Sequence, residues 1–377
     1  MPFVYFATAC FVVWLVKTSG IYPSGSDTMY HVYRGDYVYN AIKSGNWYPL
    51  YDPAWYNGVE ILRYWSPFPA YVMAFCQYLA GGSQFGAYLF YIGGVCFLGA
   101  CVWPFIGRGF NRPYLGAFIG LLWFFMPNNL CAIFIEGNLA RSLSMIFLPV
   151  FIYSVYKYLY NHKLRYIPLM VFTFLLMELC HLGYAGMVAI AVIIYGIVYI
   201  IQKGRKKAVL DVVISMIFGF MLLGIWLVAS LRGGITSLDN SENMANFFQN
   251  LWITINPFER LTRGFEYFYF GFATLVVIVF GILFGYKKSR TGFVTGFIIL
   301  LMTTKSAYAV LKHLPGSQYL WMLRFISIAL CMILMSFLMW DRLKKTLVLM
   351  LCVLLVVDTI PSLSLIVGEH NDISVQE

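Results

Sequence analysis

The feature that most restricts the fold of this chain is the alternation of long apolar runs with short basic segments. Of its 377 residues, 61% are hydrophobic and 11% are charged, whereas soluble domains carry about 25% charged residues. A chain this apolar cannot cover itself with a water-facing surface. The sequence therefore predicts an all-α, polytopic integral membrane protein, a helical bundle in which residues 1–377 form a single transmembrane domain.

The apolar runs give about eleven candidate membrane spans. Several are shorter than the ~20 residues that cross ~30 Å of hydrocarbon, a mismatch that tilt or local bilayer thinning would absorb. The segment 67–80 is also apolar, but it opens with Pro67 and Pro69 and is predicted to lie at the membrane interface. The expected spans are 2–18, 84–106, 113–127, 141–157, 166–180, 183–202, 211–231, 267–286, 292–304, 320–340 and 346–362.

Lysine and arginine gather between these spans, which sets the expected orientation. Basic loops are retained on the cytoplasmic side of a membrane. With eleven spans, all the basic loops fall on that side together with the N-terminus, and a prokaryotic cell membrane is the expected location. The net charge of +10 forms no continuous basic face, so nucleic acid is not an expected partner. The basic segments are 108–112, 157–165, 203–207, 287–290 and 342–345.

The opposite, extracytoplasmic face is expected to carry the function. It receives a large first loop, 19–83, in which amphipathic or interfacial helices are predicted, and a second large loop, 231–266. Nearly all the polar residues of interest lie on this side, whereas the cytoplasmic loops are short and basic. Membrane lipids are therefore expected partners of the functional face.

The first loop opens with Asp27, His31 and Arg34, which recur at helical spacing. They would share one side of a helix over 28–43 that stops at Gly45. One interpretation makes Asp27 the N-cap of that helix, with the other two side chains solvated. The other makes Asp27 a general base or substrate anchor, with His31 and Arg34 beside it.

A cluster of aromatic residues follows in the same loop. Tryptophan and tyrosine favour the membrane interface, so an interfacial belt is one interpretation. A platform that stacks sugar rings or guides a lipid tail is the other, and both can hold. The residues are Trp47, Tyr48, Tyr51, Trp55, Tyr56, Tyr64 and Trp65.

Two polar pairs lie at the outer ends of spans. Glu136 and Arg141 suit a local ion pair that caps adjacent helices. Glu178 and His181 are three residues apart, a spacing that can place metal ligands on one helix face in bundles. Because polar groups near the membrane interior are energetically costly, such a pair also marks a candidate functional site.

Arg324 lies about one turn into an apolar segment, at its outer end. It can snorkel to the lipid headgroups, or it can clamp a phosphate, because a guanidinium binds phosphate bidentately and stays charged. The chain has no Walker A sequence and no G-x-G-x-x-G after a strand. A nucleotide cofactor is therefore not expected.

These residues together resemble a known family. Asp27-Thr28-x-x-His31-x-x-Arg34, then Gly45-x-Trp47-x-Pro49 and Trp55-Tyr56-x-Gly58, resemble the opening loop of the bacterial and archaeal membrane proteins termed "6-pyruvoyl-tetrahydropterin synthase related". The resemblance continues in order with Glu136-Gly137-Asn138, with His181 at the end of a span, and with Trp321-x-x-Arg324-Phe325.

By architecture that family is similar to the GT-C glycosyltransferases, helical membrane bundles with a large first outer loop. The resemblance implies transfer of a sugar from a polyprenyl-phosphate donor to a glycan, lipid or protein acceptor on the extracytoplasmic side. Asp27 matches the acidic position that acts as base. From the chemistry of their side chains, His31 would assist it and Arg324 would clamp the phosphate. The substrate-binding residues would be Arg34, Glu136, Arg141, Glu178, His181 and Arg324.

Two other functions stay open from the residues alone. A non-catalytic protein that handles or exports lipid or polysaccharide in envelope biosynthesis would need Arg324 for lipid binding and would tolerate asparagine at position 27. A membrane metalloenzyme would hold a divalent ion such as magnesium, manganese or zinc. Its candidate ligands are Asp27, His31, Glu178 and His181.

Overall fold

A computed structural model shows that the chain is built from helices. It describes residues 1–19, 22, 25–55, 58–232, 251–256, 269–314, 317, 320–340, 343–363 and 366; these parts contain no strand longer than a single bridge, and one such bridge joins Asp52 and Val59. The helices are α1 (Pro2–Ser19), α2 (Thr28–Lys43), α3 (Ile61–Tyr64), α4 (Phe68–Leu79), α5 (Gln84–Gly109), α6 (Pro113–Trp123), α7 (Pro127–Phe134), α8 (Leu139–Asn161), α9 (Tyr166–Cys180), α10 (Leu182–Lys203), α11 (Lys206–Leu222), α12 (Gly224–Arg232), α13 (Leu251–Ile255), α14 (Phe272–Phe284), α15 (Lys287–Met302), α16 (Lys305–Leu311), η4 (Met322–Arg324), α17 (Phe325–Met339), α18 (Lys345–Thr359) and η5 (Ile360–Leu363).

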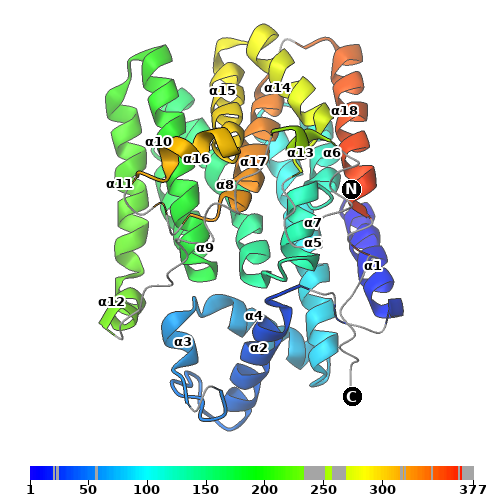
Figure 1. Ribbon diagram of the computed structural model, residues 1–377, viewed down its shortest axis with the longest axis vertical. Coiled ribbons are helices and arrows are strands. Elements are labelled where there is room, and N and C mark those ends of the chain that lie inside the picture. The colour runs from blue at the N-terminus through cyan, green and yellow to red at the C-terminus, as the bar shows by residue number, and fades with distance from the viewer. Residues whose placement is uncertain are drawn as a thin grey trace.

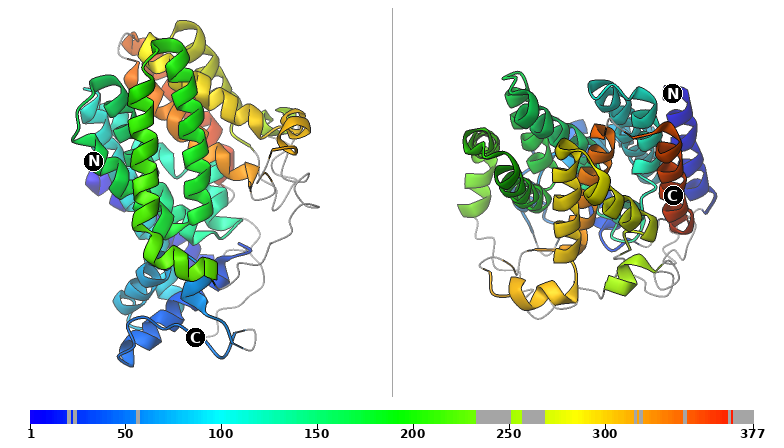
Figure 2. Two further views of the ribbon diagram at one scale, coloured as in Figure 1. Left: turned by 90° about the vertical axis from the view of Figure 1, so that its left-hand side faces the viewer. Right: turned by 90° about the horizontal axis from the view of Figure 1, so that it is seen from above.

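The longer helices stand side by side in a bundle, and α2, α3 and α4 form a smaller cap at one end (Figure 1). Helix α17 is central to the bundle, because the whole segment Met322–Met339 is buried and packs against α8, α10 and α15. Figure 2 shows the same division from the side, with the cap below the bundle. Arg324, which directly precedes α17, therefore lies in the interior of the protein rather than at its surface.

Several helices are suited to cross a membrane. By length and composition, four helices in the described parts qualify, namely α5, α8, α10 and Met322–Met339. Two bent pairs, α6 with α7 and α11 with α12, raise the number to six if each pair forms one broken span. The prediction of an all-α protein with helices suited to span a membrane is confirmed. The predicted count of about eleven spans is not, because four to six helices in the described parts meet the criteria for a span.

The cap has a hydrophobic core of its own. Helix α2 occupies the predicted range 28–43 and ends before Gly45, whose φ of +87° suits the predicted stop. Its Val38 packs with Ile61 and Leu62 and with residues of α4. Most of the first predicted loop is thus helical and folds onto the bundle, whereas the second, 231–266, lies largely outside the described residues.

Four of the five basic segments, 108–112, 157–165, 203–207 and 287–290, meet at the end of the bundle opposite the cap (Figure 1). Lys157 donates to the carbonyl of Gly109, Arg205 contacts His162, and Tyr160 donates to the carbonyl of Lys288. Helix α8 begins beside the cap and ends among these contacts; its 23 residues span about 34 Å at 1.5 Å per residue. The two ends are therefore one membrane thickness apart, as the charge pattern requires.

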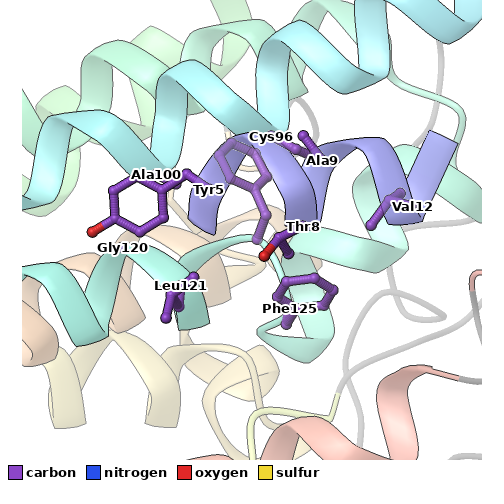
Figure 3. Close-up of a pocket in the computed structure, with 10 residues that line it drawn as sticks. Tyr5, Thr8, Ala9, Val12, Cys96, Ala100, Gly120, Leu121 and Phe125 are labelled. Atoms are coloured by element: carbon purple, nitrogen blue, oxygen red, sulfur yellow. The ribbon is translucent and has the colours of Figure 1, made fainter. Parts of the chain in front are cut away.

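Helix α1 joins the bundle through a narrow apolar seam. Tyr5 donates a hydrogen bond of 2.8 Å to the carbonyl of Ala117, and Gly120 lets α6 approach α5, since a Cβ there would lie 2.5 Å from the carbonyl of Ala100. The crevice left between these helices has a volume of only about 20 Å³ (Figure 3). It is a packing seam and has no room for a ligand.

The arrangement predicts which positions face the same side of a membrane. In a variant without native cysteines, cysteines at Arg108 and Arg205 should react from one side with an impermeant maleimide, because their segments share one end of the bundle. A cysteine at Asn46, which is exposed in the cap, should react only from the other side. Labelling of Arg108 and Arg205 positions from opposite sides of intact spheroplasts would contradict this topology.

Candidate functional site

A cavity of about 410 Å³ lies between the cap and the bundle. One wall is polar and the other apolar, and both draw on segments far apart in the sequence. The polar wall holds Asp27, His31, Arg34, Asn138, His181 and Arg324, and the apolar wall includes Ile61, Leu62, Pro69, Ala70, Met187 and Trp226. Five of the predicted site positions, Asp27, His31, Arg34, His181 and Arg324, therefore line one hollow.

Asp27 is held in place by a close contact between two backbones. The amides of Ser26 and Asp27 donate to the carbonyls of Ile135 and Glu136, at 3.3 and 3.0 Å. The contact needs glycine on both sides, because a Cβ on Gly25 would lie 2.4 Å from the Cα of Gly137. Gly137 also has a φ of +63°, which other residues adopt at a cost. The first loop is thus fixed against the segment before α8.

The Asp27 carboxylate is oriented toward the cavity rather than toward its own helix. Asp27 occupies the N-cap position of α2, but its side chain makes no capping hydrogen bond. The Ser26 hydroxyl donates to its Oδ1 at 3.4 Å. Burial raises the pKa of Asp27, and Arg324 and Arg34 oppose that rise because they stabilise the ionised form. The group is half-buried and faces two guanidinium groups.

Arg34 lies beside a column of three stacked aromatic rings. Its Nε donates to the carbonyl of Tyr30, and its guanidinium lies 4.7 Å from the centre of the Trp65 ring. Trp65 stacks on Trp55, which stacks on Tyr30, with ring centres 5.6 and 5.7 Å apart. Trp55 is therefore stacked between Tyr30 and Trp65, and Trp65 lies close enough to orient Arg34. Burial lowers the pKa of Arg34 to about 10, so it stays charged at neutral pH.

His31 lies one helical turn from Asp27 on the same side of α2, as its spacing predicts. Burial, together with the nearby charge of Arg34, lowers the pKa of His31 far below its ordinary value. The imidazole is consequently neutral at pH 7. It can exchange hydrogen bonds with a ligand but adds no charge to the cavity.

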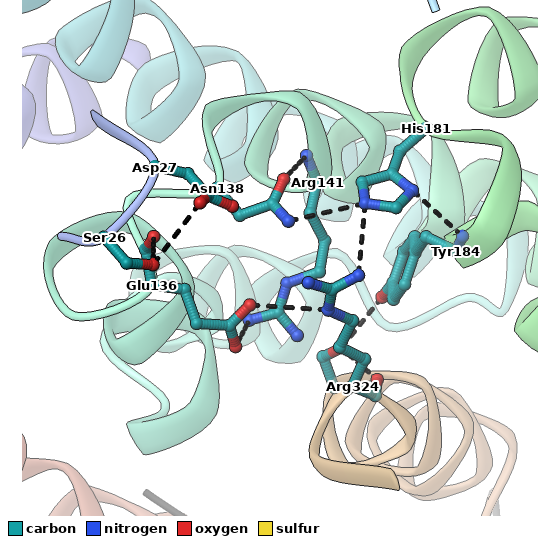
Figure 4. A network of polar contacts seen from close by, with 9 residues as sticks. Ser26, Asp27, Glu136, Asn138, Arg141, His181, Tyr184 and Arg324 are labelled. Atoms are coloured by element: carbon teal, nitrogen blue, oxygen red, sulfur yellow. Dashed lines mark hydrogen bonds and ion pairs between the residues drawn. The ribbon is translucent and has the colours of Figure 1, made fainter. Parts of the chain in front are cut away.

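Glu136 joins the two remaining arginines. Its Oε1 lies 2.7 Å from Nη2 of Arg141, and its Oε2 lies 3.5 Å from Nε of Arg324 (Figure 4). Arg141 is completely buried and Glu136 is 4% exposed, so the pair is shielded from water and its Coulomb interaction is strong. The predicted ion pair between Glu136 and Arg141 is confirmed, and it also fixes the guanidinium of Arg324.

Arg324 lies in the 3-10 turn η4, at the start of the buried helix α17. Its guanidinium lies 4.6 Å from the Trp321 ring centre, and its Nη1 lies 3.3 Å from Nε2 of His181. The side chain is 9% exposed and borders the cavity. It is therefore directed into the protein rather than toward lipid headgroups, in contrast to the snorkelling interpretation.

Asn138 and His181 each begin a helix with a side-chain cap. Asn138 Oδ1 accepts from the Arg141 amide at 2.9 Å, at the start of α8, and His181 Nδ1 accepts from the Tyr184 amide at 3.1 Å, at the start of α10. The remaining polar atoms, Asn138 Nδ2 and His181 Nε2, are 3.4 Å apart and face the cavity (Figure 4). The two caps thus determine which atoms the cavity wall presents.

The sequence profile of a family of membrane proteins, described as "6-pyruvoyl-tetrahydropterin synthase related domain", matches residues 62–366. The chain belongs to this 6-pyruvoyl-tetrahydropterin synthase related family. Neither the search of curated proteins nor the search of solved structures finds a match to the chain. The matched residues include the bundle wall of the cavity with His181 and Arg324, and Asp27 precedes them.

Glu178 stands apart from the cavity and, unlike Glu136 and Arg141, has no hydrogen bond or ion pair in the described part of the chain that links its side chain to the cavity wall. Its side chain is buried in α9, and its backbone carbonyl accepts from Ser66 at 2.9 Å, but it is not among the residues that line the hollow. His181 follows the end of α9 with an extended backbone, at φ −156° and ψ 95°. The helical face that carries Glu178 therefore does not continue to His181, although their spacing suggests that it does.

The proposed metal ligands do not gather. Within the parts of the chain that the structure describes, no group of three or more histidine, cysteine, aspartate or glutamate side chains is placed to hold a metal ion. Asp27, His31 and His181 instead share the cavity with the guanidinium groups of Arg34 and Arg324. Two fixed positive charges beside these side chains disfavour a divalent cation.

The contacts of three site residues could not be predicted from the sequence. Asn138 suits a turn by residue type, and only its distance of three from Arg141 hints at the cap that orients it. Trp65 belongs to the predicted aromatic cluster and Trp321 to a family motif, but neither position indicates that its ring lies against a cavity arginine.

The Glu136–Arg141 pair should support the fold of the bundle. Replacing Glu136 with glutamine leaves Arg141 charged, buried and without its carboxylate, a change that typically costs about 3–5 kcal/mol. We expect a clear fall in the melting temperature of the detergent-purified protein. Glu60→Gln is the matched control, because its contact with Arg63 is partly exposed and should matter little. Equal melting temperatures for the two variants would contradict this role.

Proposed function

We propose that the protein is a GT-C-like membrane glycosyltransferase that uses a polyprenyl-phosphate-linked sugar as donor, on the side of the membrane that carries the cap. The observation that carries the proposal is the shared cavity of Asp27 and Arg324. A carboxylate not engaged in capping and a buried guanidinium that border one hollow provide a proton acceptor and a phosphate ligand. The membrane family and the apolar helices support a substrate that resides in lipid.

In the proposed reaction, an acceptor hydroxyl attacks the anomeric carbon of the donor sugar. The bond between that carbon and the phosphate oxygen breaks, and its electron pair leaves with the phosphate. Asp27 takes the hydroxyl proton as the new glycosidic bond forms. Arg324 stabilises the negative charge that grows on the leaving oxygen, and its fixed position means that little reorganisation is needed during the reaction. His31 and Arg34 would bind sugar hydroxyls or the phosphate.

A route for the lipid tail is suggested by the apolar face of α10. Gly183 lines the cavity, and at Gly186 no described atom outside the helix's own backbone lies within 4 Å of the place a Cβ would take. Farther along, Ile193, Ile197 and Ile201 are exposed at helical spacing on α10. A prenyl chain could leave the cavity past the glycines and lie along this face in the bilayer.

Replacing Asp27 with asparagine should abolish transfer while the fold persists. The amide keeps the shape of the side chain but cannot accept the proton, so we expect a loss of roughly 10²–10⁴-fold in rate. The assay is release of polyprenyl phosphate from a panel of polyprenyl-phosphate hexoses and pentoses in proteoliposomes, followed by mass spectrometry. Asp211→Asn, at the basic end of the bundle where Asp211 accepts from Tyr158, is the control. A fully active Asp27→Asn protein would remove the proposed base.

The rate should also depend on pH through Asp27. Because burial raises the pKa of this carboxyl, it binds a proton at higher pH than an exposed aspartate does. The catalytic form is the ionised one, so kcat/KM should fall as the pH is lowered through that raised pKa and level off above it. His31, with its lowered pKa, should add no step near neutrality. A rate that increases on acidification is the opposite result.

The non-catalytic alternative, a protein that handles or exports lipid or polysaccharide, shares the cavity and the lipid contact. It differs in what it requires of Asp27, because carrying a lipid-linked sugar needs no proton acceptor. Lipid binding that depends on Arg324, together with full cellular function of Asp27→Asn, would favour it. Loss of transfer in Asp27→Asn with retained donor binding favours the enzyme.

A further inference from the structure

Three nitrogen atoms converge at one point of the cavity wall. Nε2 of His181 has Nη1 of Arg324 at 3.3 Å and Nδ2 of Asn138 at 3.4 Å. All three residues line the cavity, and Asn138 and Arg324 are more than nine-tenths buried. Figure 4 shows the three side chains directed toward one another from the starts of three different helices.

The chemistry of the two caps fixes where the protons are. A backbone amide can only donate, so the Tyr184 amide requires a lone pair on Nδ1 of His181. The single proton of the neutral ring is then on Nε2. In the same way, the Arg141 amide requires the oxygen of Asn138 on its side, which turns the NH₂ group toward the cavity.

The consequence is a group of donors without an acceptor. His181 Nε2, Asn138 Nδ2 and Arg324 Nη1 all carry hydrogens, so the contacts among them are not mutual hydrogen bonds. In the described part of the chain, the contact found for Asn138 Nδ2 and for Arg324 Nη1 is Nε2 of His181, and this atom cannot accept because it carries a proton. Nε2 itself has no acceptor there either. Buried donors are normally paired, so the arrangement calls for an oxygen from a ligand.

The charge of the cavity points to an anion. The charged residues that line it, in the described parts, are Asp27, Arg34 and Arg324, which leave one positive charge uncompensated. Behind the wall, Glu136 contacts both Arg324 and Arg141, and because Glu136 and Arg141 carry opposite charges they leave this excess unchanged. A phosphodiester carries one negative charge, which matches this excess, and its oxygens accept several hydrogen bonds at once.

We infer that Asn138, His181 and Arg324 form a three-donor site that binds a phosphoryl oxygen of a prenyl-phosphate ligand. The identification of the ligand as a prenyl phosphate rests on the proposed function, whereas the donor geometry does not. Asn138 and His181 act as binding residues whose orientation is set by the helices they cap. The site recognises an oxygen that only accepts hydrogen bonds, and it disfavours a hydroxyl, which would bring a further proton.

The caps provide variants that separate binding from folding. Asn138→Asp keeps a cap oxygen for α8, since aspartate is as good an N-cap as asparagine, but it replaces the cavity donor with a negative oxygen. His181→Asn keeps a capping group for α10 and is too short to supply the donor of Nε2. Both proteins should melt near the wild-type temperature, and each should bind farnesyl phosphate roughly 10- to 100-fold more weakly, the usual effect of losing a hydrogen bond to a charged group.

The experiment measures binding of farnesyl phosphate, farnesol and inorganic phosphate to the full-length protein in detergent by calorimetry. Tight binding of farnesyl phosphate, weak binding of the other two, and loss in both variants with unchanged melting support the site. Tight binding of inorganic phosphate that both variants lose supports the anion site but identifies a free phosphate as its source. Wild-type affinity for farnesyl phosphate in Asn138→Asp and His181→Asn overturns it.

Failure of the proposed function would look different. If wild-type protein releases no polyprenyl phosphate from any donor, yet binds farnesyl phosphate through Asn138 and His181, the transferase assignment fails and the three-donor site stands. If transfer occurs and depends on Asp27, but both cap-preserving variants keep wild-type affinity and rate, the site fails and the transferase assignment stands.

Discussion

The structure around the cavity depends on one buried carboxylate. Glu136 contacts Arg141 on α8 and Arg324 at the start of α17, and it does so out of reach of water. In such surroundings an unpaired guanidinium is costly, so each arginine adopts the position at which Glu136 can reach it. The carbonyl of the same residue accepts from the Asp27 amide. One residue thereby sets the relation between the cap, α8 and the central helix.

Helix caps link the fold to the chemistry of the wall. Asn138 and His181 each use one polar atom to start a helix and leave the other facing the hollow. The orientation of the second atom is then decided by the backbone and does not depend on a ligand. A binding wall built this way is preorganised, because its donors are already in place before any substrate arrives. The aromatic contacts of Trp65 and Trp321 do the same for Arg34 and Arg324.

The sequence predicts the class of fold and much of the wall, for clear reasons. The scarcity of charge requires lipid as solvent, and the spacing of Asp27, His31 and Arg34 places them on one side of α2, as found. The spacing of Glu178 and His181 predicts that the two side chains share one helix face. This prediction fails because the helix ends between them. The caps of Asn138 and His181 could not be predicted, since they depend on backbone geometry that residue type does not specify, and histidine is an uncommon N-cap.

The contact between Gly25 and Gly137 has a consequence for the length of the chain on either side of it. Between Gly25 and Asp27, one added residue would advance the chain by about 3.5 Å, break the pairing of the Asp27 amide with the Glu136 carbonyl, and swing the carboxylate out of the hollow. Affinity tags, fluorophores and grafted domains therefore cannot be placed within this tripeptide.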